Sequence, residues 1–421
     1  MSDVPYGWGQ RRLMDLVRIP NGQVDPRVEP FRSQILLAPD HIAPKSGRII
    51  CCETAASQGA ISRKYQVFPG DVLYSKIRPA LRKAALADFS GICSADIYPL
   101  RPSAEIDSSY LLNVVLSDRF SQFADSVSGR SGIPKINRTE LEEFHLVLPP
   151  IAEQRRIAEI LDVADEAVRS TERLAAKLEQ TRKGLLHELL TRGVNELGCL
   201  REPGSNAVSF QESVPGRITS TWPVMSIGDA CSIVQDGTHL PPPRVPDGPL
   251  LLSVRNIIGQ ELVLTGADTR IPRSFFNAMH RNWRIELGDV CIAVVGATIG
   301  KLARVGKLPT FTIQRSLAVL RGNPELLDNE YLLEVLSTPE LQHQIWDRVN
   351  QTAQPGIYLA ELRGLPLPVP PLGEQRRICT RLTAIRAQAD SALREVAKLV
   401  SLKRGLMDDL LTGRVRVGAS E

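Results

Sequence analysis

The stretch PPIAEQRRI, from Pro149 to Ile157, occurs a second time as PPLGEQRRI, from Pro370 to Ile378. Glu153 and Glu374 begin the identical EQRRI segments, and the offset between them is 221 residues. At this offset residues 110–194 align with residues 331–415 without a gap. A five-residue identity inside so long a register indicates an internal duplication, which sets the architecture of the whole chain.

The similarity between the two copies continues upstream, interrupted by small insertions. GDVLYSKIRPALRK, which begins at Gly70, resembles GDVCIAVVGATIGK, which begins at Gly288, at an offset of 218. The surroundings of Trp8 weakly resemble those of Trp222. The chain therefore consists of two copies of one unit, each a variable globular part followed by a more similar helical part.

A long helix is predicted after each Pro-Pro pair. Proline suits the first turn of a helix because it has no N–H to leave unpaired, and Glu153 suits the positive end of the helix dipole. Apolar residues then recur with a period of about 3.5, which is typical of a coiled coil. Arg182 and Lys403 interrupt this pattern at equivalent positions of the two copies. The residues expected in the buried seam are Ile157, Leu161, Val168, Leu178, Leu185, Ile378, Leu382, Ile385, Val396, Leu399 and Leu406.

Each predicted helix has about 40 residues and a length of about 60 Å, so its apolar stripe needs a partner surface. The other copy supplies a matching stripe, and we expect the two helices to pair as an antiparallel coiled coil with the globular parts at opposite ends. The alternative is that each helix packs on its own globular part.

The predicted fold class is α/β, with two mixed α/β globular parts. Short strands separated by Gly and Pro support it, among them GRIICCE (47–53), DVLYSKI (71–77) and DVCIAVV (289–295). The expected organisation is a first globular part (1–148), a long helix (149–194), a linker (195–221), a second globular part (222–369), a second long helix (370–415) and a tail (416–421).

Composition sets loose limits on function. The 421 residues carry 43% hydrophobic and 23% charged side chains, and the net charge is +4. These are ordinary globular values, and so mild a basic excess permits a nucleic-acid partner without arguing for one. The N-terminus has no apolar core of signal-peptide length, and no apolar run is long enough for a membrane span. Seven Cys without a CxxC pair indicate free thiols, so we expect a cytoplasmic protein.

The sequence matches no common enzyme motif convincingly. GATIGKL, from Gly296, is one residue short of a phosphate-binding loop, and Leu302 stands where that motif needs Ser or Thr. A strand-turn that uses Gly for backbone reasons is the better interpretation. HExxH, GxSxG and a convincing nuclease pattern are missing from the sequence. No catalytic residue, metal ligand or cofactor site is therefore predicted.

Basic and polar residues do cluster in the globular parts. Arg and Lys neutralise phosphates, Arg can bond guanine with two hydrogen bonds, and Gln can do the same to adenine. A solvated surface charge is the alternative for each residue taken singly. The DNA-binding candidates are Lys76, Arg78, Arg82, Lys83, Arg130, Lys135, Arg138, Arg281, Arg284, Lys301, Arg304, Arg315 and Gln354.

LVLPPIAEQRRI and LPVPPLGEQRRI, in a duplicated chain that also repeats GDV, resemble the specificity (S) subunit of type I restriction-modification systems. The resemblance implies two target recognition domains, each reading one half of a split sequence in double-stranded DNA. It implies that the paired helices fix the spacing and dock two modification (methyltransferase) subunits, with restriction subunits as further possible partners. S-adenosylmethionine, Mg²⁺ and ATP would belong to those partners, and this chain would hold no active site.

Two features leave questions open. SKIRPALRK in the first copy replaces the glycine-bearing AVVGATIGK of the second, so the local turn is expected to differ. Gln154, Arg155 and Arg156 are expected to make contacts between the helices or with a partner subunit. Two other functions remain as alternatives: a coiled-coil scaffold with two protein-binding heads, and a nuclease with an unrecognised site.

Overall fold

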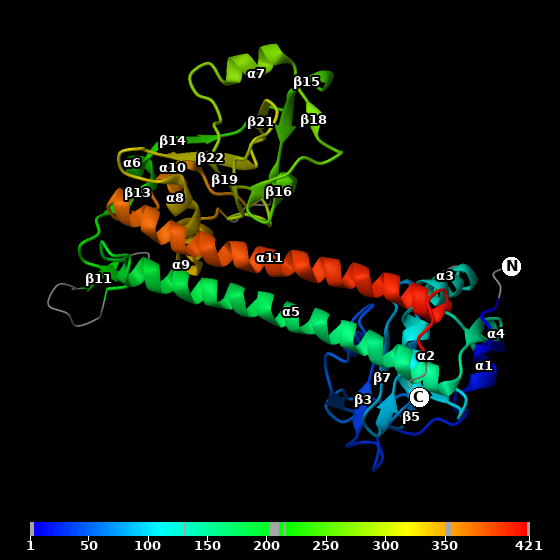
Figure 1. The fold of residues 1–421 in the computed structure, drawn as a ribbon. Helices are drawn as coiled ribbons and strands as arrows, with labels where there is room; N and C mark the ends of the chain where they lie inside the picture. The colour runs from blue at the N-terminus through cyan, green and yellow to red at the C-terminus, as the bar shows by residue number, and fades with distance from the viewer. Residues whose placement is uncertain are drawn as a thin grey trace. The chain divides into compact units, whose positions relative to one another are not determined.

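The structure is a computed structural model in which residues 4–129, 132–201, 210–213, 216–238, 240–350 and 355–418 are described. The chain divides into two compact units (Figure 1). The first unit joins residues 1–173 to residues 392–421, and the second comprises residues 174–391. Each unit thus contains one globular part together with one half of each long helix.

Two four-stranded sheets form the first globular part, in the orders β2-β9-β6-β7 and β4-β3-β8-β5, and β1 pairs with β10. Its strands are β1 (Gly9–Arg12), β2 (Val17–Arg18), β3 (Ile35–Leu37), β4 (Glu53–Thr54), β5 (Tyr65–Val67), β6 (Val72–Ser75), β7 (Ala84–Leu86), β8 (Gly91–Cys93), β9 (Ile97–Pro102) and β10 (His145–Leu148). Its helices are α1 (Leu13–Leu16), η1 (Pro39–His41), η2 (Pro79–Leu81), α2 (Ser108–Leu116), α3 (Asp118–Val127) and α4 (Arg138–Glu142).

A six-stranded sheet, in the order β14-β22-β19-β20-β17-β16, and a three-stranded sheet, β18-β15-β21, form the second globular part. Its strands are β11 (Phe210–Ser213), β12 (Gly216–Thr219), β13 (Val224–Ser226), β14 (Cys231–Asp236), β15 (Val245–Leu252), β16 (Ile257–Ile258), β17 (Glu261–Leu262), β18 (Thr269–Arg270), β19 (Val290–Ala293), β20 (Leu302–Arg304), β21 (Phe311–Ile313), β22 (Leu317–Gly322) and β23 (Pro366–Pro368). Its helices are α6 (Ile227–Ala230), η3 (Val254–Asn256), α7 (Arg273–Met279), α8 (Asn329–Leu336), α9 (Pro339–Asp347) and α10 (Leu359–Arg363).

The two GDV segments lead into equivalent strands, β6 and β19, and the reason for their aspartates is structural. Asp71 is buried and binds the guanidinium of Arg101 at 2.8 and 2.9 Å. Asp289 is equally buried and binds Arg321 at 2.7 and 2.9 Å. The GRIICCE prediction is wrong, because in this segment Ile50 is 63% exposed and β4 begins only at Glu53. Within this run Ile49 pairs with Ile42 in an isolated bridge and packs on a core cluster, but no continuous strand forms.

The long helices are α5 (Ile151–Arg192) and α11 (Leu372–Leu411), and they pair antiparallel. In the first unit the beginning of α5 shares a hydrophobic cluster with the end of α11, through Ile157 and Met407. In the second unit the end of α5 shares a cluster with the beginning of α11, through Leu189 and Ile378. Both clusters also include residues of the adjoining globular part. The helices therefore pack on each other and, near their ends, on a globular part as well.

The predicted seam residues differ in burial along the helices. Those near the helix starts, such as Ile157, Leu161, Ile378 and Leu382, are 0 or 1% exposed. Val168 is 9% exposed. The others are half-buried: Leu178, Leu185, Ile385, Val396, Leu399 and Leu406. A single pair of helices covers each seam residue from one side, which explains why burial is complete only where a globular part adds a second wall. No described helix is both long and apolar enough to cross a membrane.

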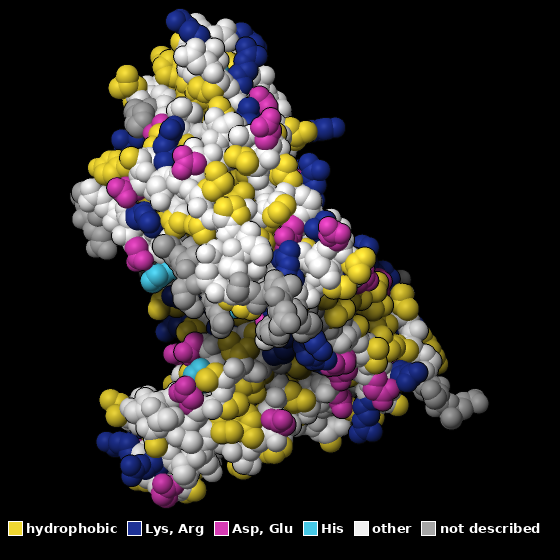
Figure 2. Space-filling model, turned by 90° about the vertical axis from the view of Figure 1, so that its left-hand side faces the viewer, with side chains coloured by type: hydrophobic (Ala, Val, Ile, Leu, Met, Phe, Trp, Pro, Cys, Tyr) yellow, Lys and Arg dark blue, Asp and Glu magenta, His cyan; other side chains and the backbone are white. Residues whose placement is uncertain are grey.

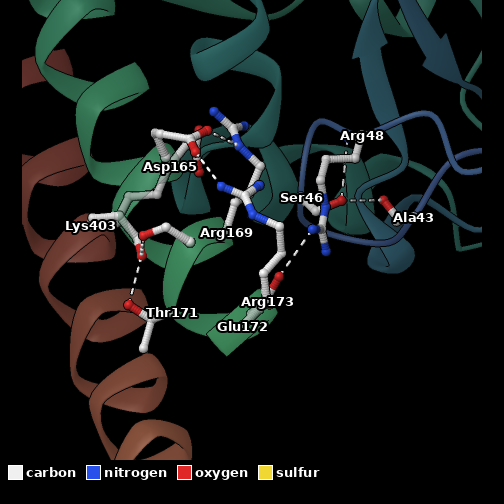
Figure 3. A network of polar contacts seen from close by, with 12 residues as sticks. Ala43, Ser46, Arg48, Asp165, Arg169, Thr171, Glu172, Arg173 and Lys403 are labelled. Atoms are coloured by element: carbon white, nitrogen blue, oxygen red, sulfur yellow. Dashed lines mark hydrogen bonds and ion pairs between the residues drawn. The ribbon is translucent and has the colours of Figure 1, made fainter. Parts of the chain in front are cut away.

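Lys403 and Arg182, which interrupt the heptad pattern, each form an ion pair with a carboxylate. Lys403 Nζ donates to Asp165 Oδ1 at 2.6 Å, from α11 to α5 (Figure 3). Figure 3 also shows Arg48, from the loop after η1, which binds Glu172 of α5 at 3.0 Å. Arg182 binds Glu334 of α8 at 3.2 Å, and burial raises the pKa of that carboxyl against the opposing effect of Arg182. The polar interruptions thus fix how the helices lie against each other and against the globular parts.

Replacing Lys403 with Met is expected to destabilise the chain by about 1 kcal/mol, because Asp165 then loses its partner beside an apolar seam. The double variant that also changes Asp165 to Leu is expected to regain most of this loss, since an apolar pair suits the seam. Urea denaturation of the natural chain, the two single variants (Lys403→Met and Asp165→Leu) and the double variant would give the coupling free energy of the ion pair. A coupling of zero would show that the ion pair does not contribute to helix pairing.

The glutamate of the helix-entry motif, Glu153, accepts hydrogen bonds from two residues that lie far from it in the sequence. Trp8 Nε1 donates to Glu153 Oε2 at 3.0 Å, and Arg416, which follows the end of α11, donates to both carboxylate oxygens at 2.8 and 2.9 Å. Burial opposes ionisation of Glu153, but the hydrogen bonds from Arg416 and Trp8 outweigh it and lower the pKa. We call this set, Trp8, Glu153 and Arg416, the first clamp.

The second clamp repeats this arrangement with Trp222, Glu374 and Arg201. Trp222 Nε1 donates to Glu374 at 3.2 Å, and Arg201, which follows the end of α5, donates at 2.9 Å. The backbone N–H of Val194 adds a bond of 2.8 Å. Residues assigned from sequence to a linker and to a tail therefore bind the start of the opposite helix.

Gln154 does not contact the other helix, so the expectation for it is wrong. It is completely buried, accepts a hydrogen bond from the N–H of Asp107, and donates to the carbonyls of Glu105 and Pro149. Gln375 makes the same three kinds of bond in the second copy, to residues 328, 326 and 370. A side-chain amide offers both a donor and an acceptor, which is what a buried loop with unpaired backbone groups requires.

Candidate nucleic-acid interface

The turns after β6 and β19 share several backbone hydrogen bonds despite their different sequences. Four hydrogen bonds of residues 75–83 recur in residues 293–301. The N–H of Arg78 bonds Pro134 O at 2.7 Å, and that of Gly296 bonds Pro355 O at 2.8 Å. The three other equivalent pairs are Ser75 to Lys83 and Ala293 to Lys301, Ile136 to Lys76 and Ile357 to Val294, and Leu81 to Arg78 and Ile299 to Gly296. The turns therefore share a framework but differ locally, as expected: the N–H of Arg82 bonds Pro79 O in the first copy, whereas the N–H of Gly300 bonds Ala293 O in the second.

The shared turn needs two residues with positive φ. In the second copy these are Gly296 at 86° and Gly300 at 87°. In the first copy Arg78 and Arg82 take the same positions, at 49° and 48°. The left-handed conformation costs a residue with a side chain about 1 to 2 kcal/mol, and such strain is typical of functional sites. Sequence propensity does not predict these shared positions, because arginine rarely adopts a conformation that glycine adopts freely.

Arg82 has a structural role. Its guanidinium bonds Asp118 at the start of α3, and Asp118 also accepts a bond of 2.6 Å from Arg404 of α11. Those two arginines lower the pKa of Asp118 although burial opposes them. At the equivalent Gly300 a Cβ would lie 2.2 Å from Gln342 Oε1, so the Gln342 side chain would have to move. Each copy thus stabilises this end of the turn in its own way.

Arg78 is exposed and, within the described part of the chain, its guanidinium has no hydrogen bond or ion pair. Lys135 is also exposed, and the bridge between Ile77 and Lys135 places the two cations on adjacent segments. Lys76 lies over the ring of Tyr98, with its Nζ 5.2 Å from the centroid. Lys76, Arg78 and Lys135 therefore lie on two adjacent segments of the first globular part.

The other candidates of the first part are less available to DNA. Arg138 lies over Tyr98 at 5.8 Å and donates to the carbonyl of Pro20 and to Asn21. Lys83 donates to Pro39 O at 2.6 Å. Arg130 lies outside the described residues.

In the second globular part the candidates separate into two areas. Arg281 and Arg284 are exposed in the segment after α7, and Arg284 lines a pocket of about 420 Å³ together with Lys307. Figure 2 shows Lys and Arg side chains gathered over the α7 end of this part. Lys301 is exposed beside the glycine turn.

The remaining candidates of the second part have other contacts or cannot be placed. Arg304 binds Glu330 at 2.8 Å. Arg315 is exposed beside β22 and has an interaction within the chain. Gln354 lies outside the described residues. The structure therefore does not bring the two copies' candidates to equivalent positions, apart from Lys83 and Lys301.

Several titratable side chains are buried in the cores of the globular parts. Burial raises the pKa of the Cys93 and Cys291 thiols, which lie on β8 and β19. Burial also lowers the pKa of His280, whose Nε2 lies 2.9 Å from Thr312 Oγ1. Among the described residues there is no group of three or more His, Cys, Asp or Glu arranged to hold a metal ion.

Comparison with known proteins links this duplicated structure to one family. Residues 56–180 and 277–399 both match the family model of the type I restriction modification DNA specificity domain. The chain is 26% identical over 371 residues to the putative MjaX specificity subunit of Methanocaldococcus jannaschii, a match that covers 84% of this chain and 80% of that one. It is 30% identical over 190 residues to the EcoDI specificity subunit of Escherichia coli, which covers 44% of this chain and 42% of that one.

Solved structures share the fold. A chain from a study of the complex assembly and conformational transition of the type I R-M system matches with a TM-score of 0.62 and 23% identity, over 99% of this chain and all of the other. The type I S subunit from M. genitalium matches with a TM-score of 0.55 and 16% identity, over 98% of this chain and 97% of that one. At these identities the likeness concerns the fold alone.

Proposed function

This chain belongs to the family of type I restriction-modification DNA specificity proteins, and from that premise we propose that it recognises a bipartite target in double-stranded DNA. Each globular part, 1–148 and 222–369, would read one half of the target. The observation that carries the proposal is the shared turn, which has four hydrogen bonds and two positive-φ positions in common between the copies and different side chains on them. One frame with two sets of side chains suits two half-sites of different sequence.

The paired helices would fix the distance between the two half-sites. The clamps support this role, because each ties the start of one helix to the segment that follows the other. A rigid antiparallel pair can hold two reading heads at a set separation, as half-site spacing on DNA requires. The exposed apolar side chains of the helices, which include Val163, Leu174, Leu393, Val400 and Leu402, would offer docking surface to two modification (methyltransferase) subunits, and restriction subunits would join the same complex.

The chain would be the non-catalytic part of that complex, in the cytoplasm. S-adenosylmethionine, Mg²⁺ and ATP would be bound by partner subunits. The reading heads supply phosphate neutralisation and base contacts, for which exposed Arg and Lys side chains are suited.

Replacing residues 9–148 with the equivalent region of a specificity protein of known target tests the proposal. The replacement keeps Trp8 and the first clamp. Half of the methylated motif is expected to change to the donor's half-site, because each head reads independently. Methylome sequencing of a host that carries the chimera and the modification subunit would show this.

The natural chain in the same host is the control, and its motif supplies the unchanged half. A motif altered in both halves, or altered in neither while the chimera is folded and bound to its partners, would contradict modular reading.

A further inference from the structure

We propose that Arg78 is a specificity-determining residue, which reads a guanine in the half-site of the first globular part. The inference rests on the proposed function and adds to it one residue and one base. It starts from a strained backbone position whose side chain has no structural partner.

Arg78 and Arg82 occupy the two left-handed positions of one turn, but the chain uses them differently. Arg82 is half-buried and bonded to Asp118. Arg78 is exposed, and its guanidinium is unpaired among the residues that the structure describes. Contacts inside the chain therefore explain the arginine side chain at position 82, whereas the described contacts give the side chain of Arg78 no structural benefit. A contact outside the chain supplies one.

The backbone holds Arg78 firmly, which suits a side chain that must reach a base. Its N–H bonds Pro134 O at 2.7 Å, and its carbonyl accepts a bond of 2.9 Å from Leu81. The second copy shows that the turn itself needs no side chain here. Gly296 makes the equivalent bonds, and nothing lies within 4 Å of a Cβ placed on it. Position 78 thus faces open space.

Positions that the two turns share suit phosphate contacts, whereas positions at which they differ suit base contacts. Phosphates have the same chemistry in every DNA sequence, so a phosphate contact is useful to both heads. Both turns keep a lysine, Lys83 and Lys301, although Lys83 also donates to Pro39 O. Bases differ between half-sites, so base contacts belong to positions where the heads differ, as Arg78 and Gly296 do. Arginine's commonest specific contact is a pair of hydrogen bonds to guanine in the major groove.

Two cations and two exposed apolar residues near Arg78 support a DNA surface at this position. Lys135 is exposed on the adjacent segment and Lys76 lies two residues before Arg78, so phosphates on either side of the base would meet positive charge. Ile133 is 59% exposed and Leu81 is 38% exposed, and both offer apolar contact to a thymine methyl group.

Arg78→Gly in the full chain, assembled with its modification subunit, tests the inference. The variant is expected to fold normally, because glycine occupies the same turn in the second copy. Methylome sequencing is expected to show one G·C position of one half-site becoming degenerate, with the other half-site and the spacer unchanged. Affinity for the natural target is expected to fall about tenfold or more, while affinity for a target mutated at that position stays the same.

Arg78→Lys keeps the charge and removes the paired hydrogen bonds, so it is expected to relax the same position. Lys45→Gly is the matched control, since Lys45 is another cation with positive φ, at 58°, and it lines a pocket with Arg404 and Met407 of α11. It is expected to leave the motif unchanged.

An unchanged motif in Arg78→Gly would overturn the inference, as would a full motif in Arg78→Lys, which would make Arg78 a phosphate contact. The same loss in Lys45→Gly would also count against it. The domain replacement described above distinguishes failure of this inference from failure of the proposed function. If that replacement changes one half-site and Arg78→Gly changes nothing, the inference alone fails; if neither changes the motif, the proposed function fails.

Discussion

Glu374→Ala is expected to lower the free energy of unfolding by about 3 kcal/mol, because it leaves a half-buried cation and two buried donors without their acceptor. The Glu374 side chain is 3% exposed and that of Arg201 is 22% exposed. Trp222 Nε1 and the N–H of Val194 would lose the same carboxylate. Urea denaturation followed by tryptophan fluorescence would measure the loss, with Trp222 as a nearby reporter.

The clamps and one surface residue provide the comparison for this variant. Glu153→Ala removes the equivalent carboxylate, but Arg416 is 43% exposed, so solvent would replace part of the lost interaction and the expected loss is smaller. Glu159→Ala is the control, since Glu159 is exposed and pairs with Arg156 on the same helix face; a change within about 0.5 kcal/mol is expected. Equal effects of Glu374→Ala and Glu159→Ala would show that the second clamp does not stabilise the fold.

Insertion of one heptad into each long helix is expected to abolish methylation of the natural target and to create a new one. The insertions would follow Arg173 and Ser391, at the border between the two compact units, so the contacts inside each unit are kept. Seven residues preserve the phase of the seam and lengthen each helix by about 10 Å, or about three base pairs of DNA. The new motif is expected to keep both half-sites and to have a spacer longer by about that number.

A seven-residue replacement at the same places, with the same inserted sequence, is the matched control and should leave the spacer unchanged. Insertion into one helix alone is expected to be harmful, because the clamps tie each helix start to the segment after the other helix. Circular dichroism would confirm that the doubly extended chain is folded. A folded, DNA-modifying variant with the natural spacer would contradict the role of the helices in spacing.

The duplication, the two long helices and their pairing could be predicted from sequence. A gapless repeat and a period of 3.5 are local patterns, and a helix with an apolar stripe must find a matching surface. The same reasoning did not find the clamps. Trp8 and Arg416 lie at opposite ends of the chain, and Arg201 lies in a segment without periodicity, so their convergence on Glu153 and Glu374 depends on how the helices close.

For the DNA-binding candidates, too, sequence predicts one part and only tertiary contacts decide the other. Basic residues could be grouped from sequence, but their availability could not be judged, because Arg82 and Arg138 are engaged by groups far along the chain. The left-handed conformation of Arg78 could not be predicted for a different reason. Sequence propensity assigns the left-handed conformation to glycine, whereas the hydrogen bonds of β6 and of residues 134–136 impose it on arginine. Periodic patterns determined the architecture; long-range contacts determined which side chains are free to act.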